Sequence, residues 1–240
     1  MALYHDEGVV LRTAKLGEAD RIVTLFTERH GKVRAVAKGV RRTKSRFGGR
    51  LEPFMRVDLL LGEGRTFDTI SQAESLAAYA GAIVGDVDAY AAANAIAETL
   101  DDLAGTEHEP APAQYRLLVG ALHALATCRH APRDIAWSYI LRALSMAGWT
   151  PRLDSCVVCG TTRDLCFFSP AAGGMMCRRD YTPEAAPCEE PCRRRLRALL
   201  EGDWTALDGT GHDDVPVGQA VQSWAQYYLE RPLRSLRLLD

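Results

Sequence analysis

Cysteines between residues 156 and 192 have the residue type and the spacing of a metal site. Cys156 and Cys159 are separated by two residues and followed by Gly160, which is the pattern of a zinc knuckle. In a knuckle, two thiolates face one ion while backbone amides turn toward their sulfur atoms. One complete knuckle with further cysteines within about 35 residues predicts a structural zinc ion, rather than reduced thiols without metal.

The second half of this site is irregular, and its fourth ligand stays open. Cys177 follows a pair of glycines and supplies a third thiolate, but Asp180 stands where a second knuckle would place its cysteine. We favour Cys192 or Cys188 as the fourth ligand, because both lie at the start of a predicted helix, from which zinc folds often draw ligands, and Asp180 remains the third candidate. A catalytic zinc ion is not expected, since no His-Glu pair or open three-ligand set is visible.

The two remaining cysteines are expected in the hydrophobic core. Cys166 lies in an apolar stretch before Phe167 and Phe168, and Cys128 lies on a predicted helix with apolar neighbours. The chain has seven cysteines and no signal-peptide pattern at its start, which argues against a disulfide framework. We therefore expect a cytoplasmic protein with no membrane partner.

A second group of residues has the charge to bind phosphate. Residues 1–80 hold 14 Lys and Arg against 10 Asp and Glu, whereas the remainder holds 15 against 21. The net charge of -2 hides this segregation, which is an electrostatic footprint of nucleic-acid binding. Phe47 and Phe54 lie among the charges and offer possible stacking faces for bases. The predicted DNA contacts in this stretch are Lys32, Arg34, Lys38, Arg41, Arg42, Lys44, Arg46 and Arg50.

Four arginines open a later predicted helix, at positions 193, 194, 195 and 197. Cations at a helix N-terminus oppose the helix dipole, so a nearby negative group would stabilise them. A tetrathiolate zinc site or a DNA phosphate could supply this negative charge. Arg195 and Arg197 are therefore further candidate DNA contacts. The alternative is a solvated basic face.

The segments that flank the basic residues between 32 and 50 have the sequence pattern of short strands with tight turns. Alternating or β-branched apolar residues predict strands over 8–11, 21–27, 32–38, 54–61 and 66–72. A long basic connection separates the third strand from the fourth. Five short strands with such a connection favour a small barrel of the OB type.

The pattern becomes helical after residue 80. Helices are predicted over 89–103, 115–128, 135–147, 193–200, 217–229 and 233–239. A segment rich in Cys, Pro and Gly interrupts them. The predicted fold is α+β and multidomain: a five-stranded OB barrel at 1–80, a helical domain at 81–150 and 193–240, and an inserted zinc-binding module at 151–192.

No catalytic motif stands out. The sequence has no phosphate-loop motif and no dinucleotide fingerprint, and its six histidines are scattered. Asp101-Asp102 and Asp213-Asp214 are adjacent in sequence, so neither pair faces one pocket from a helix. We predict a non-enzymatic DNA-binding protein. The alternatives are a nucleic-acid hydrolase or RNA-modifying enzyme with an OB appendage, and a protein-only adaptor with an incidental basic loop.

Motifs along nearly the whole chain resemble those of the RecO family of recombination mediators. They are Glu18-Ala19-Asp20-Arg21-Ile22-Val23, Phe26-Thr27, Gly31-Lys32, 37–42, Lys44-Ser45-Arg46, Leu51-Glu52-Pro53-Phe54, Cys156-x-x-Cys159-Gly160, Phe168-Ser169 and Gly173-Gly174 before Cys177. The resemblance implies an OB domain, a helical domain with an embedded zinc finger, and annealing of complementary strands without ATP. It also implies partnership with RecR and single-strand-binding protein in loading recombinase. Asp180 departs from the family pattern, since many relatives have a cysteine there.

Overall fold

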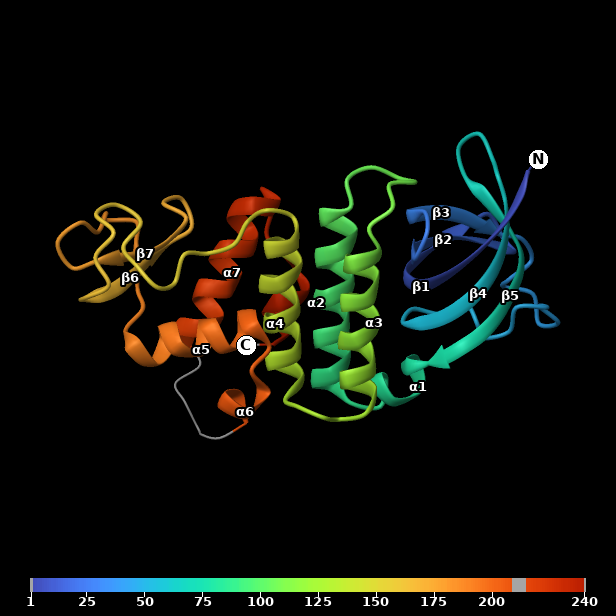
Figure 1. Ribbon diagram of the computed structural model, residues 1–240. Helices are drawn as coiled ribbons and strands as arrows, with labels where there is room; N and C mark the ends of the chain where they lie inside the picture. The colour runs from blue at the N-terminus through green and yellow to red at the C-terminus, as the bar shows by residue number, and fades with distance from the viewer. Residues whose placement is uncertain (1, 209–214, 240) are drawn as a thin grey trace. The chain divides into compact units, whose positions relative to one another are not determined.

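The computed structural model describes residues 2–208 and 215–239, and the chain divides into two compact units, Met1–Arg129 and His130–Asp240. The first unit contains a β-barrel followed by helices α1 to α3 (Figure 1). The second unit contains helices α4 to α7 and a small sheet inserted between α4 and α5. This architecture confirms the predicted α+β fold with a barrel, helices and a cysteine-bearing insert.

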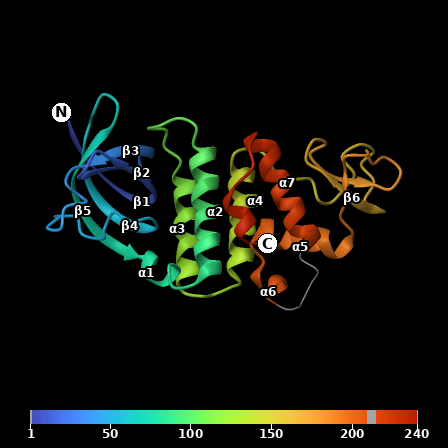
Figure 2. The same ribbon diagram turned by 180° about the vertical axis from the view of Figure 1, so that it is seen from behind.

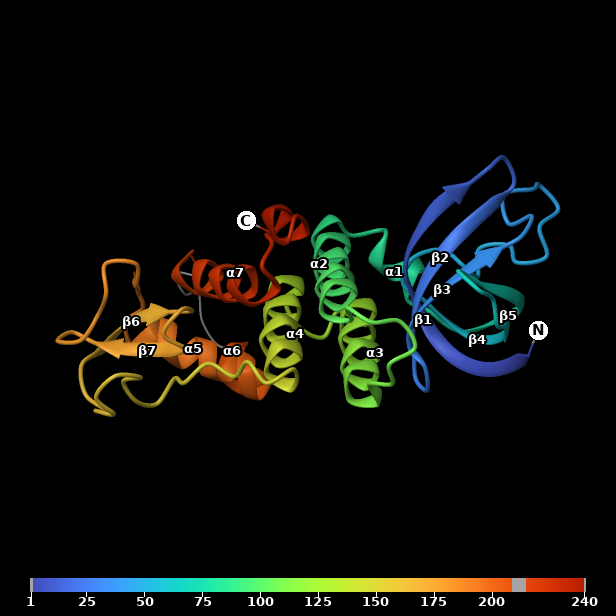
Figure 3. The same ribbon diagram turned by 90° about the horizontal axis from the view of Figure 1, so that it is seen from above.

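The barrel consists of β1 (Leu3–Leu16), β2 (Asp20–Thr27), β3 (Gly31–Ala37), β4 (Met55–Gly62) and β5 (Asp68–Ala78). The strands close in the order β1-β2-β3-β5-β4. Strand β1 pairs antiparallel with both β2 and β4, whereas β3 and β5 close the ring by a short parallel pairing. Figure 3 shows the strands curving around one another. The closed five-stranded ring confirms the predicted OB-like barrel.

Strand β3 shows how the sequence pattern builds this barrel. Its residues alternate between buried and half-buried positions along the strand. Val33 and Ala35 point into the barrel core and are fully buried, while Lys32 and Arg34, which alternate with them, face outward. This period of two is the alternation that a half-buried strand requires.

Strand β1 is much longer than the predicted 8–11 segment, because polar side chains in it have tertiary partners. The buried Asp6 carboxylate accepts backbone N–H bonds from Arg29 and His30 at 3.1 to 3.2 Å. Glu7 accepts from Arg56 at 2.7 Å across the sheet. These bonds satisfy the buried or half-buried charges, so the strand continues through a polar sequence.

Helices α1 (Tyr79–Ile83), α2 (Val87–Leu103) and α3 (Pro112–Ala126) complete the first unit. Asp86 caps α2 by accepting from two backbone N–H groups, and α2 and α3 lie side by side (Figure 1). Cys128 lies beyond the end of α3 in the left-handed region, with φ 49°. Its side chain is exposed, so the prediction of a core position for Cys128 is wrong.

The second unit is built on α4 (Pro132–Met146), which packs against α5 (Glu190–Glu201) and α7 (Val215–Leu229) (Figure 2). The short helix α6 (Trp204–Leu207) follows α5, and a 3-10 helix (Ser235–Leu238) stands within the predicted 233–239 helix. The insert forms a small sheet of β6 (Leu165–Ser169), β7 (Gly174–Cys177) and β8 (Ala186–Pro187) in the order β7-β6-β8. Among the described residues, no helix combines the length and the apolar character needed to cross a membrane.

Candidate nucleic-acid interface and metal centre

The connection between β3 and β4, residues 38–54, is a basic loop fixed at several points to the barrel. The backbone N–H of Gly39 donates to Asp20 Oδ1 at 2.7 Å, and that of Arg41 donates to the Ala19 carbonyl oxygen at 2.9 Å. Near its other end, the N–H of Phe54 donates to the carbonyl oxygen of Val10 at 2.8 Å. The loop is therefore held in place on the barrel, and its cations project from a defined backbone.

The six basic side chains of this loop are exposed, and they differ in what they contact. Lys38, Arg42 and Lys44 have no acidic partner within the described part of the chain. Arg41 donates to the carbonyl oxygens of residues 17 and 18, and Arg50 donates to that of residue 46 at 3.1 Å. These bonds orient the two guanidinium groups without neutralising their charge.

Two predicted DNA contacts on strand β3, Lys32 and Arg34, form ion pairs with acidic residues of the same chain. Lys32 Nζ lies 2.5 Å from Asp101 Oδ1, and only 14% of each side chain is exposed. Arg34 pairs with Glu107 and lies over the ring of Phe67, 5.1 Å from its centroid. Lys32 and Arg34 therefore differ from Lys38, Arg42 and Lys44 of the basic loop, which have no acidic partner among the described residues.

The two aromatic residues of the loop do not offer stacking faces. Phe47 and Phe54 are each 1% exposed. Phe47 belongs to the barrel core, and Phe54 packs edge-on against the ring of Tyr90 on α2. The guanidinium carbon of Arg46 lies over the Phe47 ring, 4.8 Å from its centroid. The expectation of base stacking on these rings is therefore wrong, because both rings anchor the loop to the hydrophobic core.

The arginines of helix α5 are also largely paired. Arg195 is buried, and its Nη2 donates to both carboxylate oxygens of Asp134 on α4, at 2.8 and 2.9 Å. Arg197 pairs with Asp154, and Arg193 pairs with Glu190. The burial of Arg195 removes it from the surface that DNA can reach, which corrects its prediction as a DNA contact.

The insert brings together four side chains with metal-ligating atoms, Cys156, Cys159, Cys177 and Asp180, which we call the metal cluster. These ligand atoms all lie within 4.8 Å of one another. Cys159 and Cys177 have their sulfur atoms 3.8 Å apart, and Cys177 Sγ lies 3.2 Å from Asp180 Oδ2. Sulfur atoms on a tetrahedron with Zn–S bonds of ~2.3 Å are about 3.8 Å apart, so the spacing fits a small tetrahedral ion.

Backbone hydrogen bonds shape the knuckle of this cluster. The N–H of Gly160 donates to the Cys156 carbonyl oxygen at 2.9 Å, with Gly160 in the left-handed region at φ 74°. The N–H of Val157 donates to Met175 on β7, which joins the knuckle to the sheet. Burial raises the pKa of Cys156, but backbone bonds from residues 158, 159 and 177 outweigh this and lower it to about 7. The backbone thus favours the thiolate that a metal ion needs.

The two cysteines favoured as the fourth ligand lie elsewhere. Cys188 and Cys192 have their sulfur atoms 2.7 Å from each other and are not in the metal cluster. The metal cluster that the geometry assembles contains Asp180 beside the three cysteines. Cys166, expected in the core, is only partly buried.

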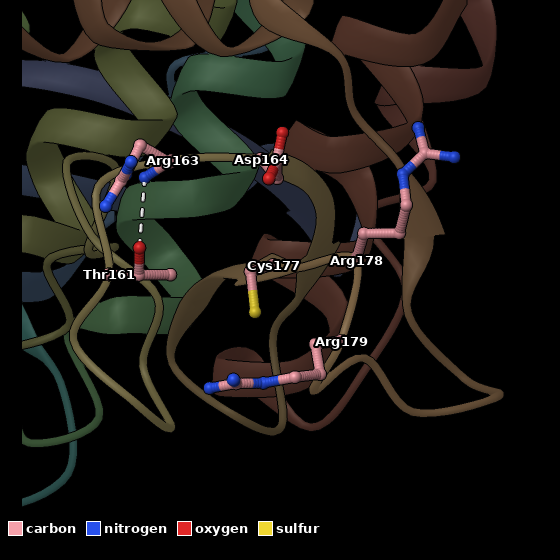
Figure 4. A pocket seen from close by; sticks show the side chains of 6 residues that line it. All are labelled: Thr161, Arg163, Asp164, Cys177, Arg178 and Arg179. Atoms are coloured by element: carbon pink, nitrogen blue, oxygen red, sulfur yellow. Dashed lines mark hydrogen bonds between the residues drawn. The ribbon is translucent and has the colours of Figure 1, made fainter.

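A pocket of about 430 Å³ lies beside the metal cluster and was not predicted from the sequence. It is lined by Thr161, Arg163, Asp164, Cys177, Arg178 and Arg179 (Figure 4). Arg163 and Arg178 are exposed and unpaired within the described residues, whereas Arg179 lies 3.5 Å from Asp180. These arginines are close to the cysteines in sequence, but whether they line one pocket depends on the fold of the insert.

Comparison with known proteins covers the whole chain. The family profile described as "Recombination protein O N terminal" matches residues 1–79, and "Recombination protein O C terminal" matches residues 84–237. The chain is 66% identical over 240 residues to the DNA repair protein RecO of Bifidobacterium animalis subsp. lactis, covering 100% of both chains. It is 46% identical to that of a Nocardioides species, with 99% of each chain covered, and 45% identical to that of Streptomyces griseus, with 100% covered.

Proposed function

Because the chain belongs to the RecO family of DNA repair proteins, a family of non-enzymatic mediators, we propose that its barrel binds single- and double-stranded DNA through the basic loop. The observation that carries this proposal is a set of exposed cations that have no acidic partner among the described residues, Lys38, Arg42 and Lys44. Phosphate oxygens would supply the missing negative charge, and each contact would release condensed counterions. Arg41, Arg46 and Arg50 add further positive charge to the same loop.

The proposed binding carries little sequence preference. Phosphate contacts position a protein on DNA without reading its bases. With Phe47 and Phe54 buried, the loop has no exposed aromatic ring of its own on which bases could stack. Electrostatic contact with the phosphate backbone therefore provides most of the proposed affinity.

The proposed activity is annealing of complementary strands without ATP. Cations bound along two strands reduce their mutual repulsion and raise their encounter rate. The sequence has no phosphate-loop motif for a nucleotide. The proposal includes loading of recombinase onto strands coated by single-strand-binding protein, with RecR as the second partner, in the nucleoid of the cytoplasm. Support for these partners comes from the family relationship.

The proposed cofactor is one structural zinc ion held by the metal cluster. The ion would fix the knuckle against β7 and so stabilise the insert, as structural zinc does in small modules. We further propose that residues 1–80 form the DNA-binding domain and that residues 151–192 form a zinc-binding module. The helices of the predicted helical domain, 81–150 and 193–240, are divided between the two compact units, with α1 to α3 in the first and α4 to α7 in the second.

An annealing assay tests the function directly. Two complementary strands, one carrying a fluorophore and one a quencher, are mixed with the protein in buffer that contains neither ATP nor Mg²⁺. We expect faster quenching than without protein, with a maximum at an intermediate ratio of protein to strand. Absence of acceleration at every ratio would contradict annealing. Cleavage of either strand after addition of Mg²⁺ would favour the alternative of a nucleic-acid hydrolase.

A further inference from the structure

We propose that Cys188 and Cys192 form a reversible redox site, whose thiols a hydroperoxide oxidises to a disulfide. Their sulfur atoms lie 2.7 Å apart, and a disulfide bond needs about 2.05 Å. Both side chains are buried, with 1% and 7% of their surface exposed. Bond formation therefore needs only a small approach of two atoms that already face each other.

The backbone on either side holds the two cysteines together. Cys188 directly follows β8, and its N–H donates to the carbonyl oxygen of Cys166 on β6 at 2.8 Å. Cys192 lies in the first turn of α5. A disulfide would link the last strand of the insert to the helix that follows it. Neither cysteine belongs to the metal cluster, so this chemistry is separate from metal binding.

The surroundings give the two sulfur atoms different roles. Cys192 lines a cavity of about 290 Å³ together with Arg195 and Val217, whereas Cys188 does not line it. The Cys188 thiol donates a hydrogen bond to the Cys192 sulfur, which lowers the pKa of Cys192 and raises that of Cys188. The cysteine that lines the cavity therefore also has the better nucleophile, because the thiolate is the reactive form.

The reaction balances with the hydroperoxide as the only oxidant. The Cys192 thiolate attacks one peroxide oxygen, the O–O bond breaks, and the leaving oxygen takes a proton to give water or an alcohol. The product is a sulfenic acid on Cys192. The Cys188 sulfur then attacks the Cys192 sulfur, the S–O bond breaks, and the hydroxyl group leaves as water with the Cys188 proton. A dithiol restores both thiols by exchange.

Peptide mapping tests the proposal on the full chain. Trypsin releases both cysteines in one peptide, Asp180–Arg193, and releases the exposed Cys128 in the separate peptide 117–129. The folded protein is treated with increasing hydrogen peroxide, quenched, unfolded and alkylated before digestion. At a lower peroxide dose than the one that oxidises Cys128, we expect peptide 180–193 to carry neither alkyl group and to have a mass two hydrogens below that of the dithiol peptide. Treatment with dithiothreitol before alkylation should restore both alkyl groups.

Two variants separate a disulfide from independent oxidation. In Cys188→Ser, we expect Cys192 to form a sulfenic acid that dimedone traps. In Cys192→Ser, we expect Cys188 to stay alkylatable at the same dose. Doubly alkylated peptide from wild-type protein, at a dose that already oxidises Cys128, would overturn the proposal. If a variant does not fold, the wild-type map decides alone. These outcomes do not depend on DNA binding.

Discussion

The ammonium nitrogen of Lys32 lies 2.5 Å from the Oδ1 atom of Asp101, and this ion pair joins strand β3 to helix α2. The same nitrogen donates to the backbone carbonyl oxygen of Asp101 at 2.8 Å. Arg12 on β1 reaches the other carboxylate oxygen at 2.6 Å. The Asp101 carboxylate thus holds two strands of the barrel to one helix. Lys32, which the charge pattern predicted as a DNA contact, forms an ion pair within the fold instead.

Replacing Asp101 with Asn should destabilise the protein in a pH-dependent way. Burial raises the pKa of Asp101, but hydrogen bonds from Lys32 and Arg12 outweigh it and leave the pKa below its usual range. A lowered folded-state pKa stabilises the fold above the unfolded pKa of about 3.9, and this stabilisation is lost as pH falls through the folded value. We expect urea unfolding to show a loss of ~1–3 kcal/mol at pH 7. The loss should shrink toward pH 3, and an equal loss at both values would contradict this assignment.

A matched pair of substitutions should separate structural from DNA-binding cations. Lys32→Gln removes a partner of Asp101, so it should lower the free energy of unfolding and leave DNA affinity nearly unchanged. Arg42→Gln removes an exposed cation that has no acidic partner in the described part of the chain, so it should lower DNA affinity and leave stability nearly unchanged. Urea unfolding measures the stability of both variants, and fluorescence anisotropy measures their DNA affinity, so the two opposite effects can be compared. The same loss of affinity in both would show that Lys32 also contacts DNA.

Replacing Arg195 with Met should destabilise the second unit strongly. The change leaves Asp134 on α4 without the buried guanidinium that donates to both its oxygens. Breaking a buried ion pair from one side typically costs about 3–5 kcal/mol. Arg194→Met is the matched control, because Arg194 is the exposed neighbour on the same helix. Urea denaturation should distinguish the two variants, and equal losses would show that burial of Arg195 contributes little.

Replacing Asp180 with Asn should weaken metal retention. Asp180 Oδ2 lies 3.2 Å from Cys177 Sγ in the metal cluster, and an amide is a poorer ligand than a carboxylate. We expect zinc affinity to fall at least 10–100-fold, roughly the effect of losing an outer-shell partner. Asp180→Cys should retain zinc, because it completes a tetrathiolate set.

Asp164→Asn is the control for this experiment, since Asp164 is an exposed carboxylate of the same insert outside the metal cluster. Elemental analysis after competition with a chelator measures the retained zinc. Equal zinc loss from both Asn variants would assign the effect to the charge of the insert instead of to a ligand.

The barrel could be predicted from the sequence where local patterns decide the structure. The alternation of β3 is a local property, and its strand was predicted within one residue. The polar first half of β1 could not be recognised, because Asp6 is satisfied there by N–H groups of the β2–β3 turn and by the ring of His30. Such a partner is distant in sequence and is brought close only by the fold.

The candidate sites likewise divide into features that depend on local sequence and features that depend on contacts distant in sequence. The knuckle of Cys156 and Cys159 could be read from spacing alone, since both thiolates come from one turn. The choice of Asp180 over Cys192 depends on where β7 and α5 lie, which spacing does not determine. Charge counting found the basic loop but could not distinguish paired from unpaired cations, because the partners, such as Asp101 and Glu107, lie far along the chain.

Reversing two cations of the basic loop should reduce both DNA affinity and its salt dependence. If Arg42 and Lys44 each neutralise a phosphate, their loss removes two released counterions from the equilibrium. Salt dependence on single strands then falls by about 0.7 per contact on a log–log plot, or roughly one to two units for the Arg42→Glu and Lys44→Glu double variant. Affinity should fall equally for strands of different sequence, because phosphate contacts do not read bases.

The matched control carries the same change of net charge at a different place. Arg116 and Arg129 are exposed cations outside the barrel, and Arg116→Glu with Arg129→Glu alters the total charge equally. Anisotropy titrations at several salt concentrations should give this control a slope close to that of wild type. A circular dichroism spectrum unchanged in both double variants would show that each is folded. Equal reductions of slope in both would mean that total charge, and not the basic loop, governs binding, and the DNA interface would then have to be sought elsewhere on the chain.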